Sequence, residues 1–113
     1  MDIKDLQNRF KLYTIAKFAE SLPDNLGFRT IRNQIVRSGS SSAANYRAVS
    51  RAKSTADFKH KLTIVEEELD ETLFWLEFTV GLNELYKERV KDLWKEGNEL
   101  LSIIVSSINK VKK

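Results

Sequence analysis

Residues that interrupt helices and strands are scarce in this chain. It has one Pro and four Gly among 113 residues. A β-sheet protein needs many tight turns, and Gly and Pro are among the residues that such turns use most. The scarcity therefore argues against an all-β domain and favours a few long helices joined by short connections.

Apolar residues recur at helical spacing in four stretches, which indicates amphipathic helices. The stretches cover residues 3 to about 21, about 28 to 53, 58–80 and about 83 to 110. Short connections between such helices favour neighbours that run in opposite directions. We therefore expect an all-α fold, an antiparallel up-down-up-down four-helix bundle that occupies residues 1–113 as one domain.

Capping residues and turns set the expected boundaries. Asp2 is the expected N-cap of the first helix, and a capping box at residues 54–57 starts the third. Residues 23–27 form the expected first turn, in which Gly27 accepts a positive φ. Gly81 is the expected residue just beyond the third helix, where a left-handed conformation is common.

The segment Ser38–Ala44, with the sequence SGSSSAA, has poor helix propensity. A break or linker at this segment is one interpretation. However, Ile31 and Val49 on either side remain in phase at 100° per residue, and Ser38 and Ser42 fall on the same side. We interpret residues 28–53 as one continuous helix whose small residues allow a neighbouring helix to come close.

Charge is strongly segregated, although the net charge is only +3. The segment 28–56 has six basic residues and no acidic ones: Arg29, Arg32, Arg37, Arg47, Arg51 and Lys53. On a continuous helix the five arginines share one side, and guanidinium groups bind phosphate with bidentate geometry. They are candidate nucleic-acid-binding residues. The alternative is pairing with the acidic run Glu66–Glu71, within the chain or between subunits.

Large aromatic residues lie on the side of the third helix opposite its core stripe. These are Phe74 and Phe78, with Trp75 at the edge. Exposed aromatic residues are typical of interfaces, so this patch predicts self-association. Partial cover by a loop or by Trp94 is the alternative.

Residue patterns for catalysis or metal binding are missing. There is no Cys, and the one His, His60, has no Glu three positions before it, as a di-iron bundle motif requires. No Gly-rich phosphate loop is present, and no His is placed beside the serines 38–42. We expect no catalytic site, no metal and no cofactor, and so no enzyme. The charged N-terminal sequence and the lack of a long apolar run predict a cytoplasmic protein without a signal peptide or membrane span.

Several segments resemble the proteins encoded in 23S ribosomal RNA intervening sequences. They are SAANYRA at 42–48, AKSTADFKHKL at 52–62 and EEELDETLFWL at 66–76, with IRNQIVRS at 31–38 and EGNEL at 96–100. The resemblance implies a bacterial antiparallel four-helix bundle that can assemble as a ring-like homopentamer, in a family to which no enzymatic activity is attached. The family is also similar to the accessory variability protein of diversity-generating retroelements, a basic pentamer that binds nucleic acid and a reverse transcriptase. The acidic residue usual in the family soon after the Asn is replaced here by Ala48 or Val49.

Two functions follow as hypotheses. The first is an oligomer that binds RNA or DNA through the basic side of the second helix. The second is a protein–protein scaffold or accessory subunit, in which the basic side pairs between subunits and does not contact nucleic acid.

Overall fold

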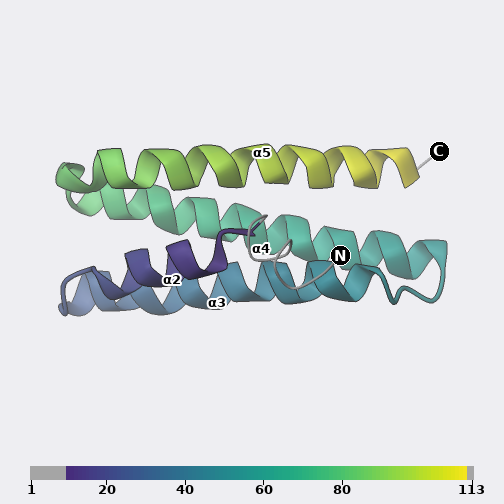
Figure 1. Ribbon diagram of the computed structural model, residues 1–113, viewed down its shortest axis with the longest axis horizontal. Coiled ribbons are helices and arrows are strands. Elements are labelled where there is room, and N and C mark those ends of the chain that lie inside the picture. Colours follow the sequence, from purple (N-terminus) through teal and green to yellow (C-terminus); the bar gives the residue numbers. More distant parts are fainter. Residues whose placement is uncertain (1–9, 112–113) are drawn as a thin grey trace.

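The computed structural model describes residues 10–111, which form an elongated bundle of helices (Figure 1). Its elements are α2 (Leu12–Glu20), α3 (Leu26–Val49), α4 (Thr55–Leu82), the 3-10 turn η1 (Glu84–Tyr86) and α5 (Lys87–Val111). The molecule measures 44 × 25 × 22 Å. Consecutive helices run in opposite directions and pack against each other, so the expected all-α up-down bundle is confirmed.

The first described helix is shorter than expected. Lys11 has φ 51° and ψ 38°, a left-handed conformation that ends any continuous α-helix, and α2 begins only at Leu12. A helix uninterrupted from residue 3 to 21 is therefore wrong. Asp2, the expected N-cap, lies outside the described residues.

The second expected helix is continuous, as predicted, with shifted ends. α3 begins at Leu26, where the Asn25 side chain accepts a hydrogen bond from the Phe28 N–H at 3.1 Å, and it ends at Val49. Gly27 lies in the first helical turn of α3 and has no positive φ. The expected positive φ at Gly27 was therefore wrong. A Cβ at residue 27 would lie 3.1 Å from Leu82 Cδ1, so close approach of α4 is the constraint at this position.

Small residues in the middle of α3 lie at the contact with α4 and α2. Ser38 and Ser42 are almost completely buried, and Ser38 Oγ lies 2.7 Å from Thr72 Oγ1 of α4. A Cβ at Gly39 would be in ordinary contact with Ile15 of α2, at 3.5 Å. The predicted close approach is confirmed, and it explains why a segment of low helix propensity remains helical, since packing compensates for propensity.

The caps of α4 match the prediction at one end only. Ser54 Oγ accepts a hydrogen bond from the Asp57 N–H at 3.0 Å, and Asp57 Oδ2 accepts one from the Lys53 N–H at 3.0 Å. At the other end α4 continues through Gly81, which has no positive φ, to Leu82, with Asn83 as the extended C-cap. Gly81 as the residue beyond the helix was therefore wrong.

The core consists of two clusters along the bundle. One joins Phe18, Ile31 and Leu76 near the α2–α3 turn, and the other joins Ala43, Leu62 and Ile108 toward the opposite end. The second cluster shows that the last turns of α3 and α5 and the first turns of α4 are packed together. This arrangement determines which charged residues share that end.

Candidate nucleic-acid interface

The six basic residues predicted to bind nucleic acid do not all lie on one helix. Arg29, Arg32, Arg37 and Arg47 belong to α3, whereas Arg51 and Lys53 follow its last residue, Val49. The predicted helix was four residues too long at this end. Arg51 and Lys53 lie in the connection that leads directly from the end of α3 to α4.

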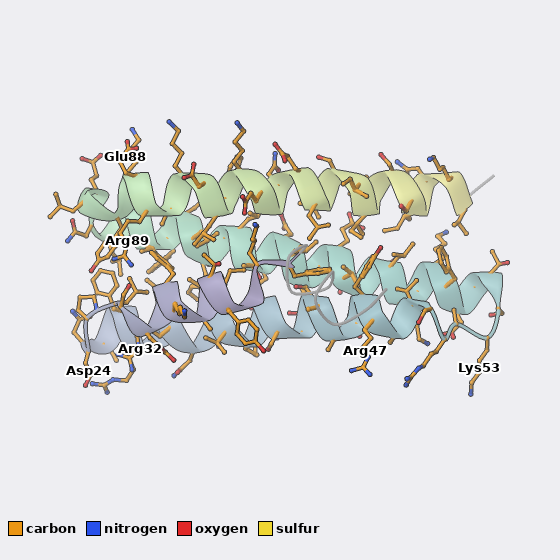
Figure 2. All side chains as sticks on the ribbon, in the orientation of Figure 1. Asp24, Arg32, Arg47, Lys53, Glu88 and Arg89 are labelled. Atoms are coloured by element: carbon orange, nitrogen blue, oxygen red, sulfur yellow. The ribbon has the colours of Figure 1, made fainter. Side chains whose placement is uncertain are left out.

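The first two arginines share one carboxylate. Arg29 Nε lies 3.1 Å from Asp24 Oδ1, and Arg32 Nη1 lies 3.8 Å from the same oxygen. Figure 2 shows Asp24 and Arg32 together at the end of the bundle where α3 begins. Asp24 comes just before the N-cap Asn25, and sequence reasoning missed it because the acidic run of α4 was the only partner considered. One charge therefore offsets part of this pair of cations.

Arg37 is paired with two carboxylates of α4. Its Nη1 donates to Glu68 Oε2 at 3.1 Å, and its Nη2 forms an ion pair with Glu71. The hydrogen bond to Glu71 raises the pKa of Arg37, and the same bond lowers the pKa of Glu71 below its ordinary value. Arg37 is therefore paired within the chain, between α3 and the acidic run of α4.

The remaining three cations have no such partner. Arg47, Arg51 and Lys53 are exposed, and within residues 10–111 no carboxylate lies at ion-pair distance from any of them. Arg47 and Lys53 point away from the other helices (Figure 2). A strong bonding network already engages the adjacent acid, Asp57, whose two oxygens each lie 2.8 Å from Lys61 Nζ. These bonds, together with the one from the Lys53 N–H, lower the pKa of Asp57.

The predicted aromatic patch lies on the outer side of α4. Phe74 and Phe78 are 51% and 41% exposed, and Trp75 is half-buried against the core. The ring centroids are 4.9 Å apart for Phe74 and Trp75, 6.0 Å for Phe74 and Phe78, and 5.7 Å for Trp75 and Phe78. The Trp75 indole N–H donates to Glu71 Oε1 at 3.3 Å, which orients the ring. Three rings thus form one partly exposed apolar surface, which we call the α4 aromatic patch.

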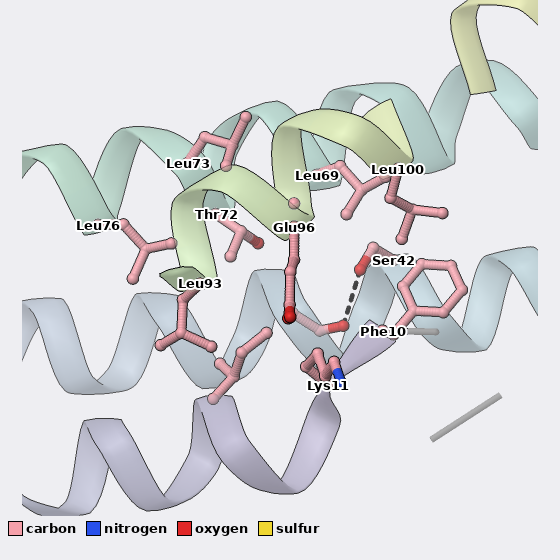
Figure 3. Close-up of a pocket in the computed structure, with 13 residues that line it drawn as sticks. Phe10, Lys11, Ser42, Leu69, Thr72, Leu73, Leu76, Leu93, Glu96 and Leu100 are labelled. Carbon is pink, nitrogen blue, oxygen red and sulfur yellow. Dashed lines mark hydrogen bonds between the residues drawn. The ribbon is translucent and has the colours of Figure 1, made fainter. Parts of the chain in front are cut away.

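Two hollows between the helices differ in size. An open one between α2 and α3, lined by Glu20, Arg32 and Val36 among others, has a volume of about 340 Å³. The other is too small for an organic ligand. A crevice lined by Leu69, Leu73 and Leu100, among others, has a volume of about 20 Å³, room for one water molecule (Figure 3). The one hydrogen bond drawn there runs from Ser42 Oγ to the Gly39 carbonyl, at 2.8 Å. In the described part of the chain, no three His, Asp or Glu side chains gather closely enough to hold a metal ion.

One arginine that the sequence did not single out has a structural role. The guanidinium carbon of Arg89, at the start of α5, lies 5.2 Å from the centre of the Phe18 ring and 5.8 Å from that of Tyr86. Its Nη2 also donates to Ser21 Oγ at 2.7 Å. Arg89 thus connects the end of α2 to α5. The sequence gives no signal for this contact, because it depends on residues 68 positions apart.

No helix within residues 10–111 combines the length and the apolar character that crossing a lipid bilayer requires.

Comparisons with known proteins agree with this architecture. The model of the 23S rRNA-intervening sequence protein family matches residues 6–106. A crystal structure of a protein with unknown function, from the S23 ribosomal protein family of Bacteroides thetaiotaomicron, is similar, with a TM-score of 0.78 and 29% sequence identity over 95% of this chain and 98% of that chain. No curated protein matches. Since the family model spans all but the two ends of the sequence, this chain belongs to the 23S rRNA-intervening sequence protein family.

Proposed function

We propose that this protein is a non-catalytic nucleic-acid-binding protein that contacts structured RNA through Arg47, Arg51 and Lys53. The observation that carries the proposal is the contrast along the edge of α3. The first three arginines each form an ion pair, Arg29 and Arg32 with the shared Asp24 and Arg37 with Glu68 and Glu71. The last three cations face solvent without a described carboxylate. Exposed cations without counter-charges are the groups that gain most from displacing counterions on a phosphate backbone.

The residue types fit this ligand. Arginine forms bidentate hydrogen bonds with phosphate oxygens, and two of the three cations are arginines. The names of the family and of the related crystal structure refer to ribosomal RNA and to a ribosomal protein, which supports RNA as the first ligand to test. The lack of three clustered acidic or His side chains in residues 10–111 favours binding rather than metal-dependent catalysis.

A gel-shift experiment at low salt tests the proposal with a charge-reversal pair. Arg47→Glu/Arg51→Glu should abolish the shift of a structured RNA, since it reverses the unpaired cations. Arg29→Glu/Arg32→Glu, two arginines near the start of α3, is the matched control and should retain most of the binding. Equal losses for both variants, or no shift with the wild-type protein, would contradict the proposal.

We also propose that the α4 aromatic patch joins copies of this chain into an oligomer. Phe74 and Phe78 expose about half of their surface, which is costly for a bundle that stays monomeric in water. Several copies would present several cationic sites, so weak contacts with one RNA would combine into tight binding.

Light scattering tests the oligomer. The wild-type protein should have a mass well above the 13.1 kDa of one chain, and Phe74→Ser/Phe78→Ser should reduce it. Leu85→Ser is the control, because Leu85 is 87% exposed but belongs to no described ring cluster. A wild-type monomer at about 10 μM, a concentration at which a contact worth ~8 kcal/mol would hold, contradicts this part of the proposal.

The scaffold alternative predicts a different result for the same variants. If the basic residues pair between subunits instead of binding RNA, Arg47→Glu/Arg51→Glu should dissociate the oligomer. Loss of RNA binding with an intact oligomer supports the nucleic-acid proposal.

A further inference from the structure

Charge is distributed unevenly along the 44 Å axis of the whole bundle. This pattern includes α4 and α5 as well as α3. We define the basic end as residues 43–65 together with residues 100–111. These two segments contain six Lys and Arg residues and one carboxylate, that of Asp57. They are Arg47, Arg51, Lys53, Lys59, Lys61 and Lys110. Lys61 is paired with Asp57, and the other five cations have no described ion pair.

Three elements bring these cations to the same end. Arg47 lies in the last turn of α3 and Lys110 in the last turn of α5, while Lys59 lies near the start of α4. Ala43, Leu62 and Ile108 belong to one core cluster, in which α4 packs against both α3 and α5. Figure 1 shows the C-terminal end of α5 and the connection from α3 to α4 at the same end of the bundle, with the start of α4 between them.

The rest of the bundle has the opposite balance. Every other carboxylate within residues 10–111 lies outside the basic end, including the run from Glu66 to Glu71 and those of α5 from Glu88 to Glu99. A polyanion approaching α4 or α5 beyond the basic end would meet these acidic groups, whereas one approaching the basic end meets Asp57 alone. Electrostatic steering therefore favours the basic end over the acidic parts of α4 and α5.

We propose that nucleic acid binds across the basic end of the bundle, and that Lys59 of α4 and Lys110 of α5 contact its phosphates together with Arg47, Arg51 and Lys53. This inference rests on the proposed function and assigns two further contact residues to it. The ligand is a nucleic acid rather than an anionic membrane, because membrane binding adds apolar insertion to charge. Among the large exposed apolar side chains of the described residues, Ile103 alone lies in these segments.

The test neutralises the two proposed contact lysines on α4 and α5, Lys59 and Lys110. A fluorescently labelled RNA hairpin is titrated by anisotropy at several salt concentrations with wild-type protein, with Lys59→Gln/Lys110→Gln and with Lys91→Gln/Lys95→Gln. The last variant is the matched control, because Lys91 and Lys95 are exposed lysines of α5 outside the basic end. Thermal unfolding followed by circular dichroism verifies that each variant folds.

Each phosphate contact contributes about 0.7–0.9 to the slope of log K against log salt. Loss of two contacts should reduce the slope by about 1.4–1.8. When salt rises from about 50 to 200 mM, the fold-decrease in affinity should therefore be about ten times smaller for the variant than for the wild type. The control should keep the wild-type slope.

The outcomes separate this inference from the proposed function. A wild-type slope in Lys59→Gln/Lys110→Gln, with binding lost in Arg47→Gln/Arg51→Gln, would overturn the end-on site and leave the α3 site standing. No binding of RNA by the wild-type protein would overturn both. Binding to phosphatidylserine vesicles by wild type but not by Lys59→Gln/Lys110→Gln, in the absence of RNA binding, would replace nucleic acid with a membrane as the ligand of the basic end.

Discussion

Arginines that look equivalent in the sequence differ in what surrounds them. Arg37 points at two carboxylates of α4, Arg29 shares Asp24 with a neighbour, and Arg47 faces solvent. All three lie on α3, where spacing alone places them on one side. The difference comes from the residues on other elements, and it decides which cations are available to a phosphate.

The pair between Arg37 and Glu71 gives a prediction about pH. The folded-state pKa of Glu71 is lowered from its ordinary 4.5, so its stabilising effect is complete at pH values above about 4.5 and is lost as the pH falls through the folded-state value. Glu71→Gln should lower the free energy of unfolding at pH 7 by no more than about 1 kcal/mol, since both side chains are at least a third exposed.

Thermal unfolding at pH 7 and at about pH 3 tests this prediction. The difference between wild type and Glu71→Gln should shrink toward zero at the lower pH. Glu67→Gln, an exposed neighbour in the acidic run, should match wild type at both pH values. A difference that persists unchanged at low pH would show that Glu71 acts through packing and not through its charge.

Helices were predicted well from the sequence where periodicity and caps agree, as in α4, whose start is fixed by Ser54 and Asp57. The continuity of α3 was also predictable, because the apolar residues remain in phase across the serines. Helix ends were less predictable. The left-handed Lys11 and the end of α3 at Val49 depend on packing between elements, and Gly27 and Gly81 resemble turn residues locally although neither has a positive φ.

The same limit applied to the candidate site. The six basic residues could be identified from the sequence. Whether Asp24, or the cations of α4 and α5, lie close to them could not be predicted without knowing how the helices are arranged. The signal for the basic end is nevertheless present in the sequence, as two segments almost free of carboxylates. Only the antiparallel arrangement shows that these segments are neighbours.

A substitution at Gly81 tests whether residue 81 lies within α4, as in the structure, or just beyond it, as the sequence pattern predicted. In the structure it lies within the helix, and a Cβ at this position would meet no atom within 4 Å. Gly81→Ala should therefore raise the free energy of unfolding by about 0.5 kcal/mol, through helix propensity and a less flexible unfolded chain. Urea unfolding followed by circular dichroism measures the change, and a destabilised variant would indicate a left-handed residue 81 after all.

Ser38 tests the contact between α3 and α4. Ser38→Leu should lower the free energy of unfolding by about 2–4 kcal/mol, because the added carbons must displace α4 and Thr72 loses a hydrogen-bond partner. Ser40→Leu, an exposed position two residues later on the same helix, should change the stability little. Equal effects of the two substitutions in urea unfolding would contradict the buried position of Ser38.

At the scale of the whole molecule, the aromatic patch and the basic end occupy different regions. The patch lies on the second half of α4, whereas the basic end is formed at its start. A chain can therefore use the patch for other copies of itself and still expose its cations. Substitutions in the α4 aromatic patch should therefore remove assembly without removing the RNA contacts, and substitutions in the basic end should do the reverse.

Avidity follows if both properties hold. Phe74→Ser/Phe78→Ser leaves the cations of each chain in place, so RNA binding should persist but weaken by about a hundredfold, the order of the gain from linked sites. Anisotropy titrations with an RNA long enough to span several chains measure the loss. A short hairpin that fits a single site should show little difference, and an equal loss on both RNAs would mean that the patch itself contacts RNA.

The central claim is that nucleic acid contacts the unpaired cations at one end of the bundle, and amide chemical shifts measured during an RNA titration test it most directly. The account predicts that a short RNA hairpin at low salt shifts the amide signals of the basic end, residues 43–65 and 100–111, and leaves the first turns of α3 unchanged. Shifts confined to the α4 aromatic patch, or no shifts at all, would contradict it.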